Sequence, residues 1–213
     1  MIEETESWRR IGTPVHGGIV LVSDHASNRV PEGIELGITQ AQLDDHIGWD
    51  IGVGAVADRM ARRHGIETLI AETPDSALRA YRAADRRLFI NAALPTESRK
   101  FMLGHQLMML EGQAVIADVV EKAALPVPGA DRLLAIGLGN YAAGALLMPY
   151  AAFREAARTM RHDIDRLART FGVSFEQACH RLSTLQRPGL RGIPFFFCRV
   201  DMAGNITKRH SAT

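Results

Sequence analysis

The sequence has few cysteines, no long apolar run and almost no net charge. Cys179 and Cys198 are the only cysteines in 213 residues, which is too few for a disulfide scaffold and fits a reducing cytoplasm. No apolar run approaches the roughly 20 residues of a membrane helix, and the acidic N-terminus lacks the apolar core of a signal peptide. Lys and Arg number 25 against 24 Asp and Glu, so the chain as a whole has no basic field for nucleic acid. We therefore expect a cytoplasmic protein without membrane contact.

A catalytic zinc motif is absent where a metallopeptidase helix would carry it. The segment Phe101–Gly112 reads FMLGHQLMMLEG, in the place of an H-E-x-x-H helix. That motif works because two His at i and i+4 bind zinc on one helix face, while the Glu activates water. Here His105 is followed by Gln106, and the i+4 position is Met109. One imidazole does not hold a catalytic zinc, so HQLMM at 105–109 predicts no metal, no cofactor and no peptidase chemistry, which argues against an enzyme.

The overall amino-acid composition is that of an ordinary globular protein. Hydrophobic residues make up 46% and charged residues 23% of the chain, which is enough to form a buried core. The periodicity of the apolar residues predicts a mixed α/β (α+β) fold that is rich in helices after residue 95.

The spacing of apolar residues, Pro and Gly places the individual elements. Strands are expected at 18–23, 66–71, 78–81 and 86–91, and the last two are expected to pair. Helices are expected at 44–63, 97–111, 113–124, 131–147, 150–160, 163–170 and 174–185, with Asp131 as the cap of the fourth. Residues 193–200 and 205–209 are expected to form a hairpin around the Asp201–Gly204 turn.

The N-terminal strand, polar loop and helix carry a first family resemblance. VSDHASNRVP at Val22–Pro31 and LDDHIGWDIG at Leu43–Gly52 resemble the start of the N-formylglutamate amidohydrolase family. This resemblance implies an α/β fold similar to zinc exopeptidases and hydrolysis of a formyl amide. Carried over by position, it would make His25 a metal or substrate contact, supported by Asp50 from the following helix.

Two observations bear on the amidohydrolase interpretation. The later segments of that family, including an Arg-bearing stretch and a downstream His motif, do not occur in this sequence, whereas a hydrolytic site needs several convergent groups. Asp24, Ser27 and Asn28 also have an alternative role, because such side chains satisfy backbone groups of a loop. A hydrolase that uses His25 is kept as an alternative function.

A second and longer resemblance begins near Ala57 and continues to Thr213. It rests on LRAYRAADRRLFINAALPTESRKFMLGHQLMMLEG at 78–112, GALLMPY at 144–150 and RLSTLQRPG at 181–189. These segments resemble the regulatory domain of short-chain fatty acyl transcriptional regulators, which is itself similar to ImmA/IrrE metallopeptidases. The resemblance implies a degenerate ImmA/IrrE-like fold, a role in transcription regulation and a short-chain acyl-CoA as the ligand.

The two resemblances together predict the domain organisation. Residues 1–58 would form a partial amidohydrolase-like segment and residues 59–213 the sensor domain, a chimera of natural or engineered origin. The regulators carry an N-terminal helix-turn-helix and continue past the SAT at 211–213, so we expect DNA contact only through a missing or alternative module. The Glu ligand of active relatives is replaced by AIGLG at Ala135–Gly139, which implies a pseudoenzyme. A homodimer is left open.

Residues 163–185 form the first candidate functional feature. The segment LARTFGVSFEQACHRL is typical of two helices joined by a Gly turn, with Leu167, Phe171, Val173 and Leu182 in the hinge. A DNA-binding helix-turn-helix would direct Ser174, Phe175, Gln177 and Arg181 toward the major groove. The alternative is a helical hairpin that serves only packing.

The stretch Gln186–Pro194 is the second candidate feature. Its Arg187 and Arg191 suit phosphate groups, and the following Phe195–Phe197 could flank an acyl or adenine group. The alternative is a solvated loop ahead of an edge strand that buries Phe195 and Phe197. Cys198 is expected to be a small core residue and Cys179 to serve helix packing.

Overall fold

The computed structural model describes residues 2–4, 9–11, 53–73 and 77–211 of the chain. The chain divides into two compact units, Met1–Leu103 and Gly104–Thr213, and each is described by itself. The expected strand at 18–23, the polar loop after it and the first part of the expected helix at 44–63 lie outside the described residues, as do His25 and Asp50.

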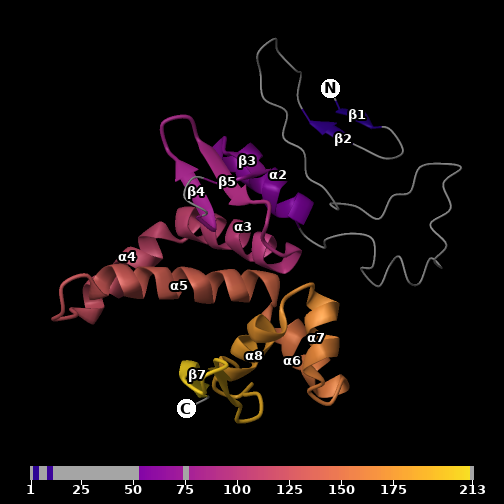
Figure 1. Ribbon diagram of the computed structural model, residues 1–213, viewed down its shortest axis with the longest axis vertical. Coiled ribbons are helices and arrows are strands. Elements are labelled where there is room, and N and C mark those ends of the chain that lie inside the picture. The colour runs from indigo at the N-terminus through magenta and orange to yellow at the C-terminus, as the bar shows by residue number, and fades with distance from the viewer. Residues whose placement is uncertain (1, 5–8, 12–52, 74–76, 212–213) are drawn as a thin grey trace, which may run out of the picture. The chain divides into compact units, whose positions relative to one another are not determined.

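The first unit is built around a three-stranded sheet (Figure 1). Its strands are β3 (Glu67–Ala71), β4 (Arg79–Arg82) and β5 (Arg87–Asn91), in the order β3-β5-β4. β3 runs parallel to β5, and β4 pairs with β5 in antiparallel register. The pairing expected between residues 78–81 and 86–91 is therefore confirmed.

The core of the first unit comes from the helix before the sheet and from the central strand. The helix α2 (Val53–His64) lies beside β3 and buries Met60 completely. Leu88 and Ile90 on β5 have no exposed surface, because alternate residues of a strand face the same side of the sheet. A short antiparallel pair, β1 (Ile2–Glu4) and β2 (Arg9–Ile11), is also described in this unit.

The helix α3 (Thr96–Glu111) begins after Pro95 in the first unit and ends in the second. It is followed by α4 (Gln113–Ala123) and by α5 (Ala130–Leu147). α4 is followed by its C-cap Ala124, which adopts a left-handed conformation with φ 44°. The expected cap at Asp131 is wrong, since α5 starts after Gly129 and Asp131 lies in the first turn without a capping hydrogen bond.

Three short helices follow α5, namely α6 (Tyr150–Thr159), α7 (Ile164–Phe171) and α8 (Phe175–Ser183). Both α7 and α8 start at a side-chain cap, with Asp163 accepting from the amide of Arg166 and Ser174 from that of Gln177. Such caps satisfy amides that have no partner inside the helix. The core of this region is formed by Met148, Phe153, Leu167, Val173, Leu182 and Leu185.

The last element is a hairpin of β6 (Phe196–Val200) and β7 (Ile206–Ser211). The carboxylate of Asp201 accepts hydrogen bonds from the amides of Ala203 and Asn205, which fixes the expected turn. Phe195 and Phe197 are half-buried, whereas Cys198 is exposed. The expectation that Cys198 is a core residue is wrong, because it shares the outward face of β6 with Phe196 and Val200.

No single helix within 53–73 and 77–211 has the length and apolar composition of a membrane span. α5 and α6 taken together meet both criteria, but they are bent by 63° at the break between them.

Candidate functional site

The helix α3, which resembles a metallopeptidase helix, packs His105 and Met109 against Gly139 of α5. His105 on α3 is only 3% exposed, and it faces Gly139 on α5. A Cβ atom built on Gly139 would lie 2.6 Å from the sulfur of Met109 and 2.9 Å from Nε2 of His105. The thioether and the imidazole therefore occupy the space beside α5 where side-chain ligands of a metal would have to converge.

Residues 135–139 lie on α5 alongside these α3 side chains. The segment AIGLG contributes no carboxylate, and within the part of the chain that the structure describes no group of three His, Cys, Asp or Glu side chains could hold a metal ion. Gln106 is 8% exposed and is an amide rather than a general base. The α3–α5 junction is thus apolar packing around one imidazole.

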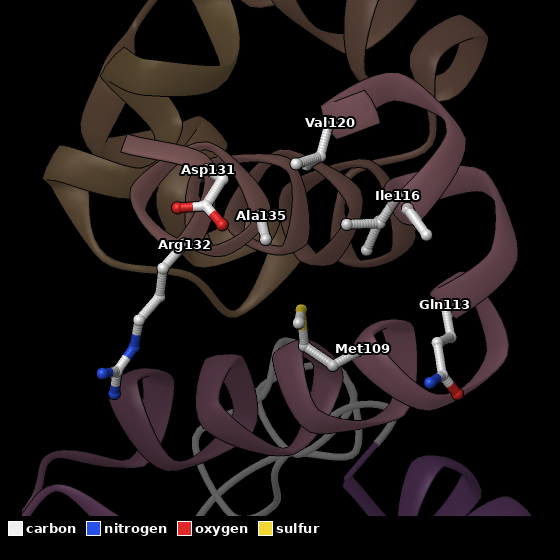
Figure 2. Close-up of a pocket in the computed structure, with 8 residues that line it drawn as sticks. Met109, Gln113, Ile116, Val120, Asp131, Arg132 and Ala135 are labelled. Carbon is white, nitrogen blue, oxygen red and sulfur yellow. The ribbon is translucent and has the colours of Figure 1, made fainter. Parts of the chain in front are cut away.

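A small pocket opens beside this junction, between α3, α4 and α5 (Figure 2). Its volume is about 270 Å³, and we call it the α3–α5 pocket. Met109 points toward Ala135 and Ile116, and Arg132 and Gln113 lie on opposite sides of the pocket. Ala117, Val120 and Asp131 complete the lining, which is mainly apolar.

A second cluster lies where α6 meets the loop after α8. The hydroxyl of Tyr150 donates to the carbonyl of Leu190 at 3.0 Å and accepts from the amide of Arg187 at 3.0 Å. The guanidinium of Arg187 lies over the Tyr150 ring, 4.6 Å from its centroid. Tyr150 thereby holds both the backbone and the side chain of Arg187 in place.

Arg181 on α8 is the buried member of this cluster. It is 3% exposed, and its Nε donates to the carbonyl of Met148 at 2.9 Å. Its guanidinium lies 5.9 Å from the ring centre of Tyr141 and 5.7 Å from that of Tyr150. Burial lowers the pKa of Arg181, because the charged form loses hydration. Among the described residues Arg181 has no carboxylate partner, and we call Tyr141, Tyr150, Arg181 and Arg187 the arginine–tyrosine cluster.

Arg191 is placed differently from Arg187, although both were predicted as phosphate contacts. The side chain of Arg191 is exposed, and its carbonyl accepts a hydrogen bond of 3.2 Å from Nε of Arg154. Tyr150 and Arg154 on α6 therefore hold the backbone of the 187–191 loop through three hydrogen bonds, to Arg187, Leu190 and Arg191. The structure brings Arg187 to the buried Arg181 and leaves Arg191 at the edge of the cluster.

The side chains expected to read DNA have structural contacts instead. Ser174 and Gln177 form a reciprocal capping box at the start of α8. Arg181 faces the interior, where it cannot reach a DNA groove without local unfolding. This geometry favours the alternative of a packing hairpin for residues 163–185, although Phe175 is 52% exposed.

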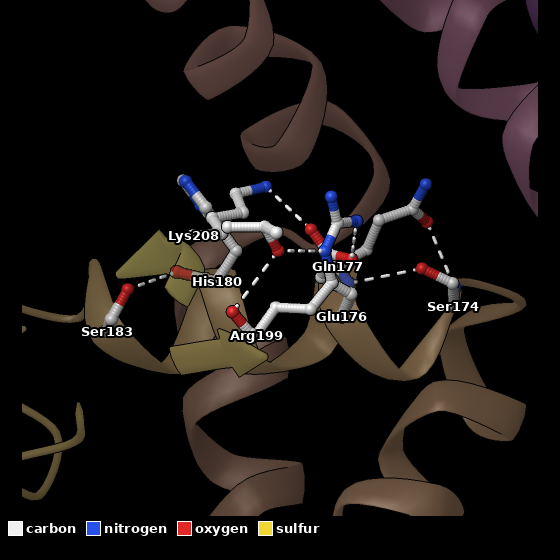
Figure 3. Close-up of polar contacts among 8 residues, drawn as sticks. Ser174, Glu176, Gln177, His180, Ser183, Arg199 and Lys208 are labelled. Carbon is white, nitrogen blue, oxygen red and sulfur yellow. Dashed lines mark hydrogen bonds and ion pairs between the residues drawn. The ribbon is translucent and has the colours of Figure 1, made fainter. Parts of the chain in front are cut away.

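An ion-pair network fastens the hairpin to α8 (Figure 3). Glu176 accepts from Nζ of Lys208 at 2.8 Å and from Arg199 at 3.0 Å. The hydrogen bond from Lys208 is the main reason that the pKa of Glu176 is lowered, with Arg199 adding to it. The hairpin that ends the described chain is thus held beside the arginine-bearing helix.

Arg187 was predicted from the sequence, whereas the two tyrosines of the arginine–tyrosine cluster were not. Tyr150 ends the GALLMPY segment, so the motif itself marked the position although no role had been given to it. Tyr141 had no signal beyond its being one of three tyrosines in the chain. Arg181 was noticed for its place in a helix-turn-helix pattern, whereas its burial depends on packing that spacing does not show.

Comparison with known proteins decides the family. Residues 61–183, more than half of the chain, match the model of the IrrE N-terminal-like domain. The chain belongs to this family. Residues 184–213 match the C-terminal domain model of the short-chain fatty acyl coenzyme A regulator. The second predicted resemblance is therefore confirmed, and the mixed α/β, helix-rich fold with it.

The curated relatives of this IrrE-like chain are transcriptional regulators. It is 48% identical over 151 residues to the propionyl-CoA carboxylase regulator of Cereibacter sphaeroides, covering 71% of this chain and 32% of that protein. It is 45% identical over 159 residues to the HTH-type transcriptional regulator PrpR of Mycobacterium tuberculosis, covering 74% and 33%. The chain spans about a third of the length of these relatives.

A solved structure supports the same assignment. A Mycobacterium tuberculosis transcriptional regulator superposes with a TM-score of 0.71 at 45% sequence identity, covering 74% of this chain and 48% of that one. The resemblance of residues 14–58 to an amidohydrolase stays a prediction, because most of that segment lies outside the described residues.

Proposed function

We propose that this IrrE-like chain is a non-catalytic, ligand-responsive domain of a transcriptional regulator, and that its ligand is a short-chain acyl-CoA. The C-terminal match to a short-chain fatty acyl coenzyme A regulator domain and the names of the relatives support this ligand class. The phosphates of the ligand would be bound by Arg187, with Arg191 at the edge of the same loop.

The observation that carries the proposal is the buried guanidinium of Arg181. A buried charge without an opposite charge is costly, and among the described residues no carboxylate pairs with Arg181. An anionic ligand bound by the exposed Arg187, whose guanidinium lies 4.6 Å from the centre of the Tyr150 ring, would place a negative charge near Arg181, which lies 5.7 Å from the same ring centre. The planar guanidinium of Arg can donate two parallel hydrogen bonds to phosphate oxygens, which the compact ammonium group of Lys does not.

The packing of α3 on α5 supports the non-catalytic part of the proposal. The side chain at the position of the second zinc ligand is the thioether of Met109, and its sulfur would be 2.6 Å from a Cβ at residue 139. A peptidase needs an open metal position and a general base, and His105 and Gln106 supply neither.

Contact with DNA is proposed to come from a module other than residues 163–185. The name of the relative PrpR contains a helix-turn-helix designation, whereas Ser174, Gln177 and Arg181 of this chain are engaged in caps and packing. The division into an amidohydrolase-like part at 1–58 and a sensor at 59–213 is part of the same proposal, and so is self-association into a homodimer.

The test is thermal unfolding of the full chain with CoA, propionyl-CoA or propionate. A ligand at about 100 times its dissociation constant stabilises the native state by roughly 2.7 kcal/mol, so CoA and its ester should raise the melting temperature by several degrees. Arg187→Ala should remove this rise. The control is Arg158→Ala, since Arg158 is an exposed arginine of α6 that lies 3.9 Å from Glu155. A melting temperature that does not respond to millimolar CoA compounds would contradict the proposal.

A further inference from the structure

We infer that a row of arginines on α6 contacts the phosphate backbone of DNA without reading its sequence. The row consists of Arg154 and Arg158 on the helix and Arg161 in the turn that follows it, and we call it the α6 arginine row. The inference rests on the proposed function only in that a domain of a transcriptional regulator acts beside DNA. It concerns residues outside both the helical hairpin at 163–185 and the arginine–tyrosine cluster.

The charge around the row is positive, although the formal net charge of the whole chain is only +1. Residues 150–162 contain the three arginines of the row, His162 and a single carboxylate, Glu155. Nη1 of Arg158 lies 3.9 Å from that carboxylate, and the two side chains are 63% and 67% exposed. Such an exposed pair contributes little, so it competes weakly with a phosphate for the guanidinium. A local excess of arginines attracts a polyanion.

Arg154 is held in place at the end of the row that adjoins the 187–191 loop. Its Nε donates to the carbonyl of Arg191 at 3.2 Å, which restrains the guanidinium before any ligand arrives. The loop itself contains two arginines and no carboxylate. The positive charge of α6 therefore continues onto the loop, and part of the ordering of Arg154 that a phosphate contact requires is already present in the fold.

The backbone of the turn after α6 supports a use for its side chains. Arg161 and His162 both have a left-handed backbone, with φ 53° and 61°, a conformation that glycine adopts at lower cost. Their amides donate to the carbonyls of Arg158 and Ala157, which fixes the turn. A cation near the end of a helix also interacts favourably with the helix dipole, but this does not require two successive basic residues in the left-handed region. Basic side chains at positions that suit glycine indicate that the side chains are used.

The composition of α6 suits a nucleic-acid backbone better than a membrane surface. The exposed residues of the helix other than Arg158 are Ala151, Ala152, Glu155 and Thr159, whereas a helix that inserts into lipid needs large apolar residues such as Trp, Phe or Leu. Positions 154 and 158 are about 6 Å apart along the helix axis, comparable with the axial rise over about two phosphates of one DNA strand. Guanidinium groups also bind phosphate oxygens through paired hydrogen bonds.

The experiment is fluorescence anisotropy of the full chain with a short labelled duplex of mixed sequence, from about 50 to 200 mM salt. Protein concentrations should reach about 100 μM, because non-specific dissociation constants are roughly 10⁻⁴–10⁻⁶ M. Each phosphate contact contributes about −0.9 to the slope of log K against log salt, so the three arginines predict a slope of about −2.7. Arg158→Gln combined with Arg161→Gly should make the slope less negative by about 2.

The variants are chosen to separate charge from folding. Arg161→Gly suits the left-handed backbone and should fold, whereas Arg161→Lys keeps the charge and should keep the slope. Arg132→Gln is the matched control, since Arg132 is an exposed arginine of α5 outside the row. If circular dichroism shows the double variant to be unfolded, Arg161→Gly alone provides the test, with an expected change in slope of about 1.

Each outcome decides the inference. Salt-dependent binding that the double variant weakens and Arg132→Gln does not would support it. No saturable binding at low salt, a slope that the double variant leaves unchanged, or binding to phosphatidylserine vesicles in place of the duplex would overturn it.

Thermal unfolding with propionyl-CoA distinguishes the inference from the proposed function. The double variant should respond to propionyl-CoA as the parent does, because both substituted residues lie outside the arginine–tyrosine cluster. DNA binding without a response to propionyl-CoA would retain the inference and reject the proposed ligand. A response to propionyl-CoA without DNA binding would reject the inference and retain the proposed ligand.

Discussion

The α3–α5 junction and the arginine–tyrosine cluster lie in the same unit, and they differ in the polar side chains that they bury. At the junction, a thioether and a glycine stand where a metal site would need ligands, and one buried imidazole remains. In the cluster, the guanidinium of Arg181, a residue that is 3% exposed, lies near two tyrosine rings. Apolar packing accounts for the α3–α5 junction. The arginine–tyrosine cluster contains a buried charge that packing alone does not explain.

The difference indicates where ligand chemistry resides in this chain. Apolar packing stabilises the fold without any ligand, so the α3–α5 junction needs none for its integrity. A buried guanidinium without a carboxylate lowers stability unless something charged joins it. Anion recognition is therefore assigned to Arg181 and Arg187, and the helix that resembles a peptidase helix has a structural role beside an apolar pocket.

The largest expected effect on stability concerns the close approach of α3 to α5. Gly139→Ala adds a Cβ 2.6 Å from the Met109 sulfur and 2.9 Å from Nε2 of His105, which forces side chains from their positions. We expect a loss of about 1–3 kcal/mol, measured by urea denaturation.

Gly137→Ala is the control for that substitution. Gly137 is on the same helix, and a Cβ there meets nothing within 4 Å. Alanine favours a helix over glycine by about 0.5–1 kcal/mol, so this variant should be more stable than the parent. If both substitutions stabilised the protein, the junction would not be packed as described.

The smallest expected effect concerns the ion pairs between α8 and the hairpin. Hydrogen bonds from Lys208 and Arg199 lower the pKa of Glu176 from its ordinary value of 4.5. A lowered carboxyl pKa stabilises the fold above the ordinary value, and that stability is lost as the pH falls through the folded value. Because the Glu176 side chain is 34% exposed, solvent screening limits the effect to about 1 kcal/mol or less.

The corresponding variant is Glu176→Gln, compared with the parent by urea denaturation across a pH series. It should be less stable than the parent at pH 7, and the difference should vanish in acid. Glu155→Gln serves as the control, since Glu155 lies 3.9 Å from Arg158 and both are well exposed. A pH-independent difference for Glu176→Gln would show that packing rather than charge holds the hairpin.

The sequence predicted most elements of the two units because their signals are local. The β4–β5 pairing follows from apolar alternation around a turn, and the helix expected at 174–185 follows from the spacing of its apolar residues. The same reasoning failed for Cys198, because alternation defines two strand faces without showing which one is buried. It failed for Asp131 because Gly129 begins α5 earlier than the acidic residue indicated.

The candidate site was harder to predict because its members come from separate elements. Arg187 was recognised from its loop, but the other members of the cluster, Tyr141, Tyr150 and Arg181, come from α5, α6 and α8. Their proximity is a product of tertiary packing. Arg181 in particular had the spacing of an exposed recognition helix, and only the packing of α8 against the end of α5 buries it.

The most direct test of the account is the affinity of the full chain for propionyl-CoA when Arg181 is replaced. Arg181→Met keeps an unbranched side chain of similar reach without the charge, and Arg181→Lys keeps the charge without the planar fork. Isothermal titration should show binding weakened by at least about 30-fold for Arg181→Met, as expected when one partner of a buried charge contact is removed, with Arg181→Lys intermediate. Circular dichroism would verify that both variants are folded. An Arg181→Met variant that is folded and binds propionyl-CoA as tightly as the parent would contradict the assignment of anion recognition to the arginine–tyrosine cluster.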